Sequence, residues 1–264
     1  MTHARALGAA QTIPIRGNVD ANLERHVRLV HAAAKEQARV LVFPELSLTG
    51  YELDLAGDLA FTENDPRLAP LLEVASFCSM TLVVGAPVRL ASRLYIGAFI
   101  VSPDRSIGLY TKQRLGAFSA SARVDGIVPP AEATVFHPGD RNPLVLVDGH
   151  TAAVAVCADT GRRSHPQAAA DRGAKTYLAS MFVIPSEFER ETTSLGAYAS
   201  QHSMAIVLAN YGGPSGGLAS GGRSGIWSEN GERLVQLDSI GAGVAVAIEG
   251  HAGWRARTIM LGSS

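Results

Sequence analysis

Three residues of this chain follow apolar, strand-like runs and have side chains suited to nucleophilic chemistry. Cys157 ends one such run and precedes a polar turn, Glu45 follows another run and a proline, and Lys112 follows a third. A thiol in this position is either a packed small hydrophobe or a nucleophile. A nucleophilic cysteine needs a nearby cation to favour the thiolate and a base to take its proton. We therefore consider the three residues together.

Each residue also has a simpler explanation when it is taken alone. Glu45 could be a general base with a raised pKa, or an ordinary solvated loop acid. Lys112 could favour a thiolate and stabilise an oxyanion, or it could be an exposed lysine at a strand end. Glu132 precedes Phe136, Pro138 and Gly139, and this pattern alone indicates almost nothing.

The order of apolar and turn-forming residues predicts an α/β protein. Helical spacing of apolar residues follows Asn18, and capping-box spacing at Ser186 and Glu189 predicts a helix from Ser186 to about Ser203. Segments with β-hairpin or buried-strand character predict two mixed sheets covered by helices: Ala6–Gln11, Val40–Phe43, Thr81–Pro87, Leu94–Val101, Ile107–Tyr110, Leu144–Val147, Ala152–Val156, Thr176–Leu178, Met204–Ala209, Ile226–Ser228, Arg233–Leu237 and Gly243–Ile248. With no linker or repeat, residues 1–264 are expected to form a single domain.

Composition excludes several classes of function. The formal net charge is -1 and basic residues are scattered, so neither nucleic acid nor a membrane is an expected partner. No apolar run approaches the roughly 20 residues of a membrane span, and no secretory leader is evident. Two cysteines do not make a disulfide framework, which favours a reducing cytoplasm. The sequence has no cluster of histidines that would predict a metal site.

In combination, and in this chain order, the three residues resemble the nitrilase superfamily of carbon–nitrogen hydrolases. FPELSLTGYE is similar to the family's glutamate motif, YTKQRL to its lysine motif, and VAVCADTGRRSHPQAAADRGAKTYLAS to its cysteine motif. YASQHSMAIVLANYGG and GGRSGIWSENGE resemble two downstream segments. The resemblance covers nearly the whole chain and implies a four-layer α-β-β-α sandwich of two mixed sheets.

The resemblance also implies a role for each matching residue. Cys157 is the expected nucleophile, Glu45 the general base and Lys112 the oxyanion stabiliser. Glu132 matches a second family glutamate that positions the lysine or the substrate. The backbone N–H of Ala158 is expected to complete the oxyanion hole. Apart from the resemblance, Phe182 follows a strand and could form a pocket wall or pack in the core, and Phe182 and Tyr51 are the candidate substrate-binding side chains. The resemblance implies no cofactor. It does imply a homodimer or a higher homo-oligomer.

The expected activity is hydrolysis of a small amide or ω-amide through a cysteine thioester, releasing ammonia or an amine. Cys-Ala-Asp at residues 157–159, where nitrile-hydrolysing members commonly show Cys-Trp-Glu, favours amide over nitrile. N-carbamoyl hydrolysis, nitrile hydrolysis and acyl transfer stay open as alternatives. Ala158 and Arg114 depart from the usual family residues, and the long segment Gly116–Ala131 could cover the pocket.

Other residues near the motifs are given structural roles or kept as rivals. His165 is expected to be a local structural residue, Asp159 to accept backbone hydrogen bonds, and Cys78 to lie in the core. Asn210 and Arg223 are expected to hold loops together. Arg162 and Arg163 are expected to be solvated. The alternative is that they bind a carboxylate of the substrate. Three rival hypotheses are a thiol redox or sensor protein, a metal hydrolase using Asp159 and His165, and a catalytically silent scaffold.

Overall fold

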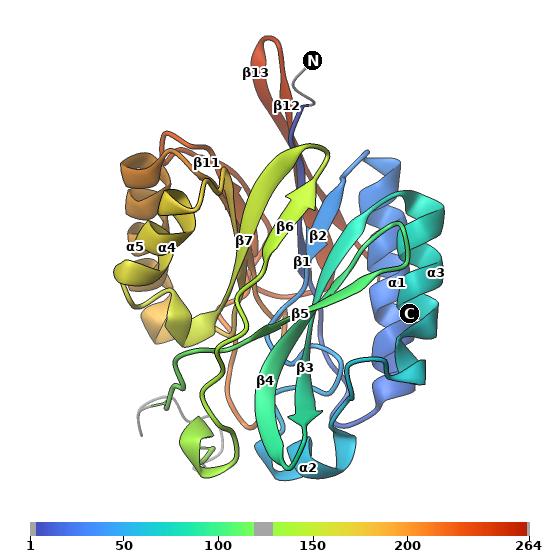
Figure 1. The fold of residues 1–264 in the computed structure, drawn as a ribbon. Coiled ribbons are helices and arrows are strands. Elements are labelled where there is room, and N and C mark those ends of the chain that lie inside the picture. Colours follow the sequence, from blue (N-terminus) through green and yellow to red (C-terminus); the bar gives the residue numbers. More distant parts are fainter. Residues whose placement is uncertain (1–3, 119–128, 263–264) are drawn as a thin grey trace.

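The structure is a computed structural model that describes residues 4–118 and 129–262. Two mixed β-sheets face each other, and helices cover the outer face of each (Figure 1). One side carries α1 (Val19–Lys35) and α3 (Ala69–Cys78), and the other carries α4 (Ser164–Asp171) and α5 (Phe188–His202). The short α2 (Ala56–Leu59) lies at one end. This arrangement confirms the predicted α-β-β-α sandwich.

The first sheet has the strand order β13-β12-β1-β2-β3-β4-β5, and the second has the order β11-β10-β9-β8-β7-β6. In each sheet three central strands are parallel, β1-β2-β3 and β7-β8-β9, and the other pairs are antiparallel. The first sheet contains β1 (Ala6–Gln11), β2 (Val40–Val42), β3 (Thr81–Leu90), β4 (Arg93–Val101), β5 (Ile107–Thr111), β12 (Gly243–Gly250) and β13 (Gly253–Met260). The second contains β6 (Leu144–Val147), β7 (His150–Val156), β8 (Thr176–Ser180), β9 (Ala205–Ala209), β10 (Gly225–Trp227) and β11 (Arg233–Gln236).

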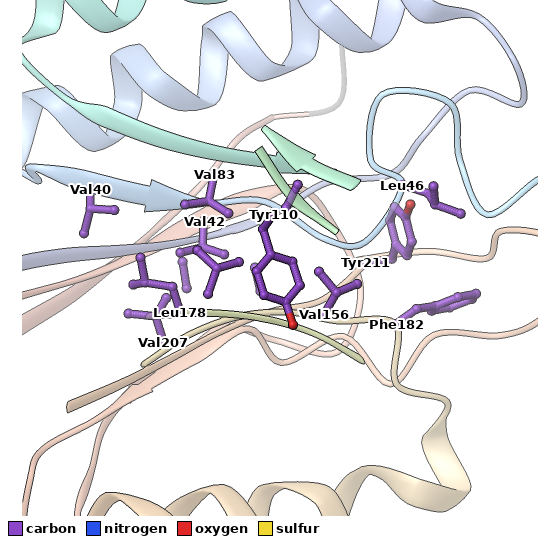
Figure 2. Packing of buried hydrophobic residues seen from close by; sticks show 14 of the residues in the cluster. Val40, Val42, Leu46, Val83, Tyr110, Val156, Leu178, Phe182, Val207 and Tyr211 are labelled. Atoms are coloured by element: carbon purple, nitrogen blue, oxygen red, sulfur yellow. The ribbon is translucent and has the colours of Figure 1, made fainter. Parts of the chain in front are cut away.

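Apolar residues on both faces of the central strands explain why these strands are buried. Val40 and Val42 point into the core between the sheets, whereas Leu41 between them packs in the cluster beneath α1 and α3. In β7, Val154 faces the other sheet and Ala155 faces the α4–α5 side. This alternation follows from the two-residue period of a strand. Figure 2 shows the inter-sheet core, which runs toward the ends of β5 and β7.

Two expectations about the elements are wrong. The predicted capping box at Ser186 does not form: Pro185–Glu187 make a 3₁₀ turn, and α5 begins at Phe188 without a side-chain cap. The sequence analysis also missed β13, which pairs with β12 along its length. This edge strand alternates polar and apolar residues and is largely exposed, so it lacks the continuous apolar run that identified the central strands.

Candidate active site

Cys157 lies where β7 turns sharply into the 3₁₀ turn Cys157–Asp159. Its φ of 44° is in the left-handed region, which costs a non-glycine residue about 1–3 kcal/mol. The Sγ atom lies 3.6 Å from the carbonyl oxygen of Phe182. Thus the cysteine is not simply the last packed residue of a strand. The surrounding structure holds it in a strained turn beside a cavity.

Glu45 follows β2 and is completely buried. Two residues that follow strands of the second sheet hold its backbone. The Glu45 N–H donates to the carbonyl of Met181 at 3.3 Å, and the Glu45 carbonyl accepts from the Tyr211 hydroxyl. β3 lies directly against this segment: a Cβ on Gly85 would stand 2.6 Å from the Pro44 carbonyl oxygen. The glutamate backbone is therefore fixed on several sides.

Lys112 lies directly after β5 and joins two carboxylates in the interior. Its Nζ is 2.6 Å from Oε1 of Glu45 and 2.7 Å from Oε1 of Glu132, and all three side chains are buried. An ammonium has three N–H donors, so these bonds leave one donor for another acceptor. The structure thus brings together three of the four predicted catalytic residues around one cation.

Glu132 accepts more hydrogen bonds than Glu45 does. Oε1 also accepts from the Tyr51 hydroxyl at 2.8 Å, and Oε2 accepts from the Gly116 N–H at 2.7 Å. By contrast, Oε2 of Glu45 is buried and has no hydrogen-bond partner among the described residues. Glu132 is therefore built to hold Lys112, and Glu45 keeps one oxygen for an incoming proton or substrate.

Burial sets the protonation behaviour of the acid and the lysine. Burial raises the pKa of Glu45 to about 7, the Lys112 charge opposes this shift, and the nearby Glu132 charge adds to it. Burial also opposes the charge on Lys112, but the surrounding Glu45, Cys157 and Glu132 outweigh that effect and raise its pKa overall. Glu45 can thus gain and lose a proton near neutral pH while Lys112 stays charged.

The resting state of Cys157 corrects one expectation. Burial raises the pKa of the thiol well above its usual value, and the Glu45 charge raises it further. Lys112 acts in the expected direction but does not compensate, because it is already bonded to two carboxylates. The thiol is therefore protonated at rest.

A cavity of about 330 Å³ opens onto the Cys157 thiol. Its lining includes Ala158, Phe182 and Glu132 from the predicted set, together with Arg114 and Phe118. Phe182 is buried and packs edge-on against Tyr51, with ring centroids 5.1 Å apart. Tyr51 does not line the cavity; it supports Phe182 and bonds Glu132 from behind. The Ala158 N–H is in the first turn of a helix, where no intrahelical acceptor exists.

The residues given structural roles behave largely as predicted. Asn210 bonds both the N–H and the carbonyl of Val183 and the carbonyl of Gly222, so it holds two loops together. Arg162 and Arg163 are exposed and do not line the cavity. The segment Gly116–Ala131 contributes Gly116–Phe118 to the cavity, but residues 119–128 lie outside the described residues.

The expectation that Cys78 lies in the core is wrong: the residue is only partly buried, at the end of α3 on the outer face of the first sheet. Cys157 ends a strand of the second sheet and packs against the inter-sheet core, and both thiols are free. The first sheet lies between them, so a disulfide would require a large backbone rearrangement. This geometry counts against a redox pair.

Two contributors to the site were missed in the sequence. Tyr211 follows β9, donates to the Glu45 carbonyl and packs edge-on against Phe182. Ser215, in the glycine-rich loop, accepts from the Tyr51 N–H at 2.8 Å. Their position near the exit of β9 was the available signal, because neighbouring parallel strands end at the same edge of a sheet.

The carbon–nitrogen hydrolase family model matches residues 6–248. The chain therefore belongs to the carbon–nitrogen hydrolase family and is an enzyme of that class. Its fold matches an amidase of the nitrilase superfamily from Nesterenkonia sp. AN1, with a TM-score of 0.81, 22% identity, and coverage of 96% of this chain and 93% of that one. Identity at this level shows a shared fold.

The chain matches only part of the length of two curated relatives. The chain is 26% identical over 239 residues to a glutamine-dependent NAD(+) synthetase of Acinetobacter baylyi, covering 88% of this chain and 42% of that protein. It is 27% identical over 172 residues to the omega-amidase NIT2 of Bos taurus, covering 65% and 59%. The chain thus spans less than half the length of the synthetase.

Among the described residues, no helix is long and apolar enough to cross a membrane.

Proposed function

We propose that this enzyme hydrolyses the C–N bond of a small amide through a thioester on Cys157. One observation carries the proposal: a buried Lys112 joins Glu45 and Glu132 beside the Cys157 turn, and Oε2 of Glu45 has no hydrogen-bond partner within the part of the chain that the structure describes. A family of carbon–nitrogen hydrolases supplies the reaction class.

Acylation follows from the protonation states. The thiol proton passes to Glu45 as Sγ attacks the amide carbonyl, because the free thiolate is disfavoured by burial. The third N–H of Lys112 and the Ala158 N–H stabilise the oxyanion, and each such donor contributes roughly 3 kcal/mol in comparable sites. When the C–N bond breaks, protonated Glu45 gives its proton to the leaving nitrogen.

Deacylation uses the same groups in reverse. Glu45, again ionised, takes a proton from water as its oxygen attacks the thioester carbonyl. The tetrahedral intermediate then releases the carboxylic acid, and the proton returns to the thiolate of Cys157. Glu132 and Tyr51 keep Lys112 in place throughout. An amine in place of water would make the same site an acyltransferase.

The comparisons support an amide as the substrate. The Nesterenkonia amidase has been seen with the acetamide moiety of fluoroacetamide on its active-site cysteine, and in complex with butyramide. The glutamine-dependent and omega-amidase relatives support an ω-amide. Arg114 and Arg190 line the cavity here and could bind a substrate carboxylate. N-carbamoyl compounds and nitriles are the alternatives that a substrate panel tests. The proposal also includes a reducing cytoplasm, which keeps the thiol available.

Trapping the acyl-enzyme tests this mechanism. Hydroxylamine should intercept the thioester formed from an amide and yield a hydroxamic acid, with Cys157 regenerated. We expect hydroxamate from wild type and from the matched Cys78→Ala variant, and none from Cys157→Ala. Hydroxamate formation that persists in Cys157→Ala would rule the thioester out. A reversible sulfenic acid on Cys157 without amide turnover would favour the redox alternative.

A further inference from the structure

Asp159 lies two residues after the nucleophile and is buried, yet the proposed reaction does not use it. Its carboxylate accepts four hydrogen bonds. Oδ1 accepts from the N–H groups of Gln113 at 3.1 Å and Arg114 at 2.7 Å. Oδ2 accepts from the N–H of Val156 at 3.2 Å and from the Tyr110 hydroxyl at 2.7 Å.

These donors come from both halves of the site. Gln113 and Arg114 directly follow Lys112, at the end of β5 in the first sheet. Val156 directly precedes Cys157, at the end of β7 in the second sheet. A single carboxylate therefore joins the segment that carries the lysine to the turn that carries the thiol. β5 and β7 belong to different sheets, so no strand pairing sets their relative position.

A chain of hydroxyl and imidazole groups orients this carboxylate. Tyr110 donates to Asp159, so its oxygen is free to accept from Nε2–H of His165 at 3.0 Å. Nδ1 of His165 then accepts from the Tyr177 hydroxyl at 2.7 Å. Every member is satisfied when His165 is neutral with its proton on Nε2, and burial lowers the pKa of His165, which favours that form.

We propose that Asp159 is a positioning residue that fixes the distance and orientation between Cys157 and Lys112, with Tyr110 and His165 holding its carboxylate in place. The strained backbone of Cys157 gives this bond set a specific task, because the left-handed turn persists only where its surroundings hold it. The prediction for turnover rests on the proposed function. The prediction for thiol reactivity does not.

The variant Asp159→Asn keeps the size of the side chain and replaces one oxygen by an amide that donates. The new amide N–H donors then face either the N–H groups of Gln113 and Arg114 or the donors of Val156 and Tyr110. Two donors cannot hydrogen-bond each other, so the side chain loses its bonds to one of the two segments. We expect kcat to fall about 100-fold, since a displacement of about 1 Å can have this effect. KM should change less than about threefold, as for a loss of transition-state interactions alone.

Alkylation of Cys157 by iodoacetamide, followed by peptide mass spectrometry, gives a readout independent of substrate. We expect the rate in folded Asp159→Asn to fall about tenfold, because the thiol is no longer aligned with its base. Asp171→Asn is the matched control: Asp171 is exposed at the end of α4 and its carboxylate bonds only Gln167 among the residues that the structure describes, so both rates should stay at wild-type values.

Several outcomes would overturn the assignment. Wild-type kcat and alkylation rate in Asp159→Asn would do so. A fall in kcat that disappears when it is expressed per folded molecule, as measured by circular dichroism, would show a structural role only. If the chain releases ammonia from no amide, the alkylation rates still decide the role of Asp159.

Tyr110→Phe decides the question if Asp159→Asn does not fold. It removes one hydroxyl from the carboxylate and leaves the ring packing in place. We expect about a tenfold fall in kcat with KM within about threefold. Tyr177→Phe, at the far end of the chain of hydrogen bonds, should have the smaller effect. Unchanged kcat in Tyr110→Phe, or a larger loss in Tyr177→Phe, would contradict the proposal.

Discussion

At the scale of single residues, Oε2 of Glu45, which no described residue hydrogen-bonds, connects structure to reactivity. A buried acceptor without a partner costs about 1–3 kcal/mol, so natural proteins seldom retain one without a use. In the proposed mechanism this oxygen receives the thiol proton. Because Glu132 already accepts hydrogen bonds from Lys112, Tyr51 and Gly116, Glu45 is the acid with capacity to act as the base.

The first prediction concerns the pH dependence of kcat/KM. Glu45 must be ionised to accept a proton, and its pKa is raised to about 7 by burial. Activity should therefore rise as pH increases through about 7. It should not fall before about pH 9, because burial also raises the pKa of the thiol. A rate profile from pH 5 to 9 measures this. A profile that is flat, or that falls with rising pH, would contradict the assignment of Glu45.

The second prediction concerns substrate choice. Arg114 lines the cavity, so replacing its charge should weaken binding of ω-amides that carry a carboxylate and leave neutral amides largely unaffected. We expect Arg114→Gln to lower kcat/KM for glutamine-like amides about tenfold relative to butyramide. Arg162→Gln, at an exposed position outside the cavity, is the matched control. An unchanged ratio would remove Arg114 from substrate recognition.

At the scale of elements, the strands position the site by close backbone packing as well as by side chains. β3 runs against the segment that carries Glu45, and a Cβ on Gly85 would overlap the backbone N of Leu46 and lie 2.9 Å from the Glu45 carbonyl carbon. These contacts are with backbone atoms, which cannot rotate away as a side chain can. β3 is therefore part of the frame that places the base.

The third prediction follows from that contact. Gly85→Ala should displace the Glu45 segment, lower kcat at least tenfold and destabilise the fold by about 1–3 kcal/mol, the usual range for overpacking. Gly108→Ala on β5 is the matched control, since its Cβ would meet Ile100 at an ordinary 3.4 Å. Kinetics and thermal unfolding measure both variants. Equal kinetics in the two would show that the close approach is unimportant.

The fourth prediction concerns α1. His26 is fully buried between the Asn22 carbonyl and the Ser47 hydroxyl, and burial lowers its pKa to about 4. The folded state disfavours protonation of His26, so the contribution of this residue to the free energy of unfolding is fully present above about pH 6.5. That contribution is lost as the pH falls toward 4. The loss should reach roughly 3 kcal/mol. Urea unfolding at pH 7 and pH 4 tests this, and His26→Gln should reduce the difference between the two pH values.

The sequence predicted the site more fully than it predicted the frame around the site. Glu45, Lys112 and Cys157 could be found because each follows an apolar strand and because their order matches a family pattern. The role of Tyr51 behind Glu132, and the contact of Tyr211 with the Glu45 carbonyl, depend on how two sheets pack. No spacing within one segment encodes such contacts. β13 was missed because an exposed edge strand carries a weak pattern.

At the scale of the whole molecule, the site exists only where the two sheets meet. The first sheet supplies Glu45 and Lys112, and the second supplies Cys157. The inter-sheet core, part of which Figure 2 shows, packs between the two sheets. Loss of packing between the sheets would therefore separate the base from the nucleophile before either strand unfolds. The catalytic geometry is a property of the complete sandwich.

The fifth prediction concerns assembly. From the family resemblance we propose a homodimer or higher homo-oligomer. Size-exclusion chromatography with light scattering should give a mass of at least twice the 27.7 kDa of one chain at micromolar concentration. A single species of 27.7 kDa that is fully active would contradict this proposal and leave the site assignments unchanged.

Ammonia release from a panel of small amides, ω-amides, carbamoyl amines and nitriles would show whether the reaction depends on the Cys157 thiol. Wild type, Cys157→Ala and the matched Cys78→Ala variant are measured side by side. We expect release from an amide by wild type and Cys78→Ala, and none by Cys157→Ala. Equal release by all three proteins would contradict a reaction that passes through the Cys157 thiol.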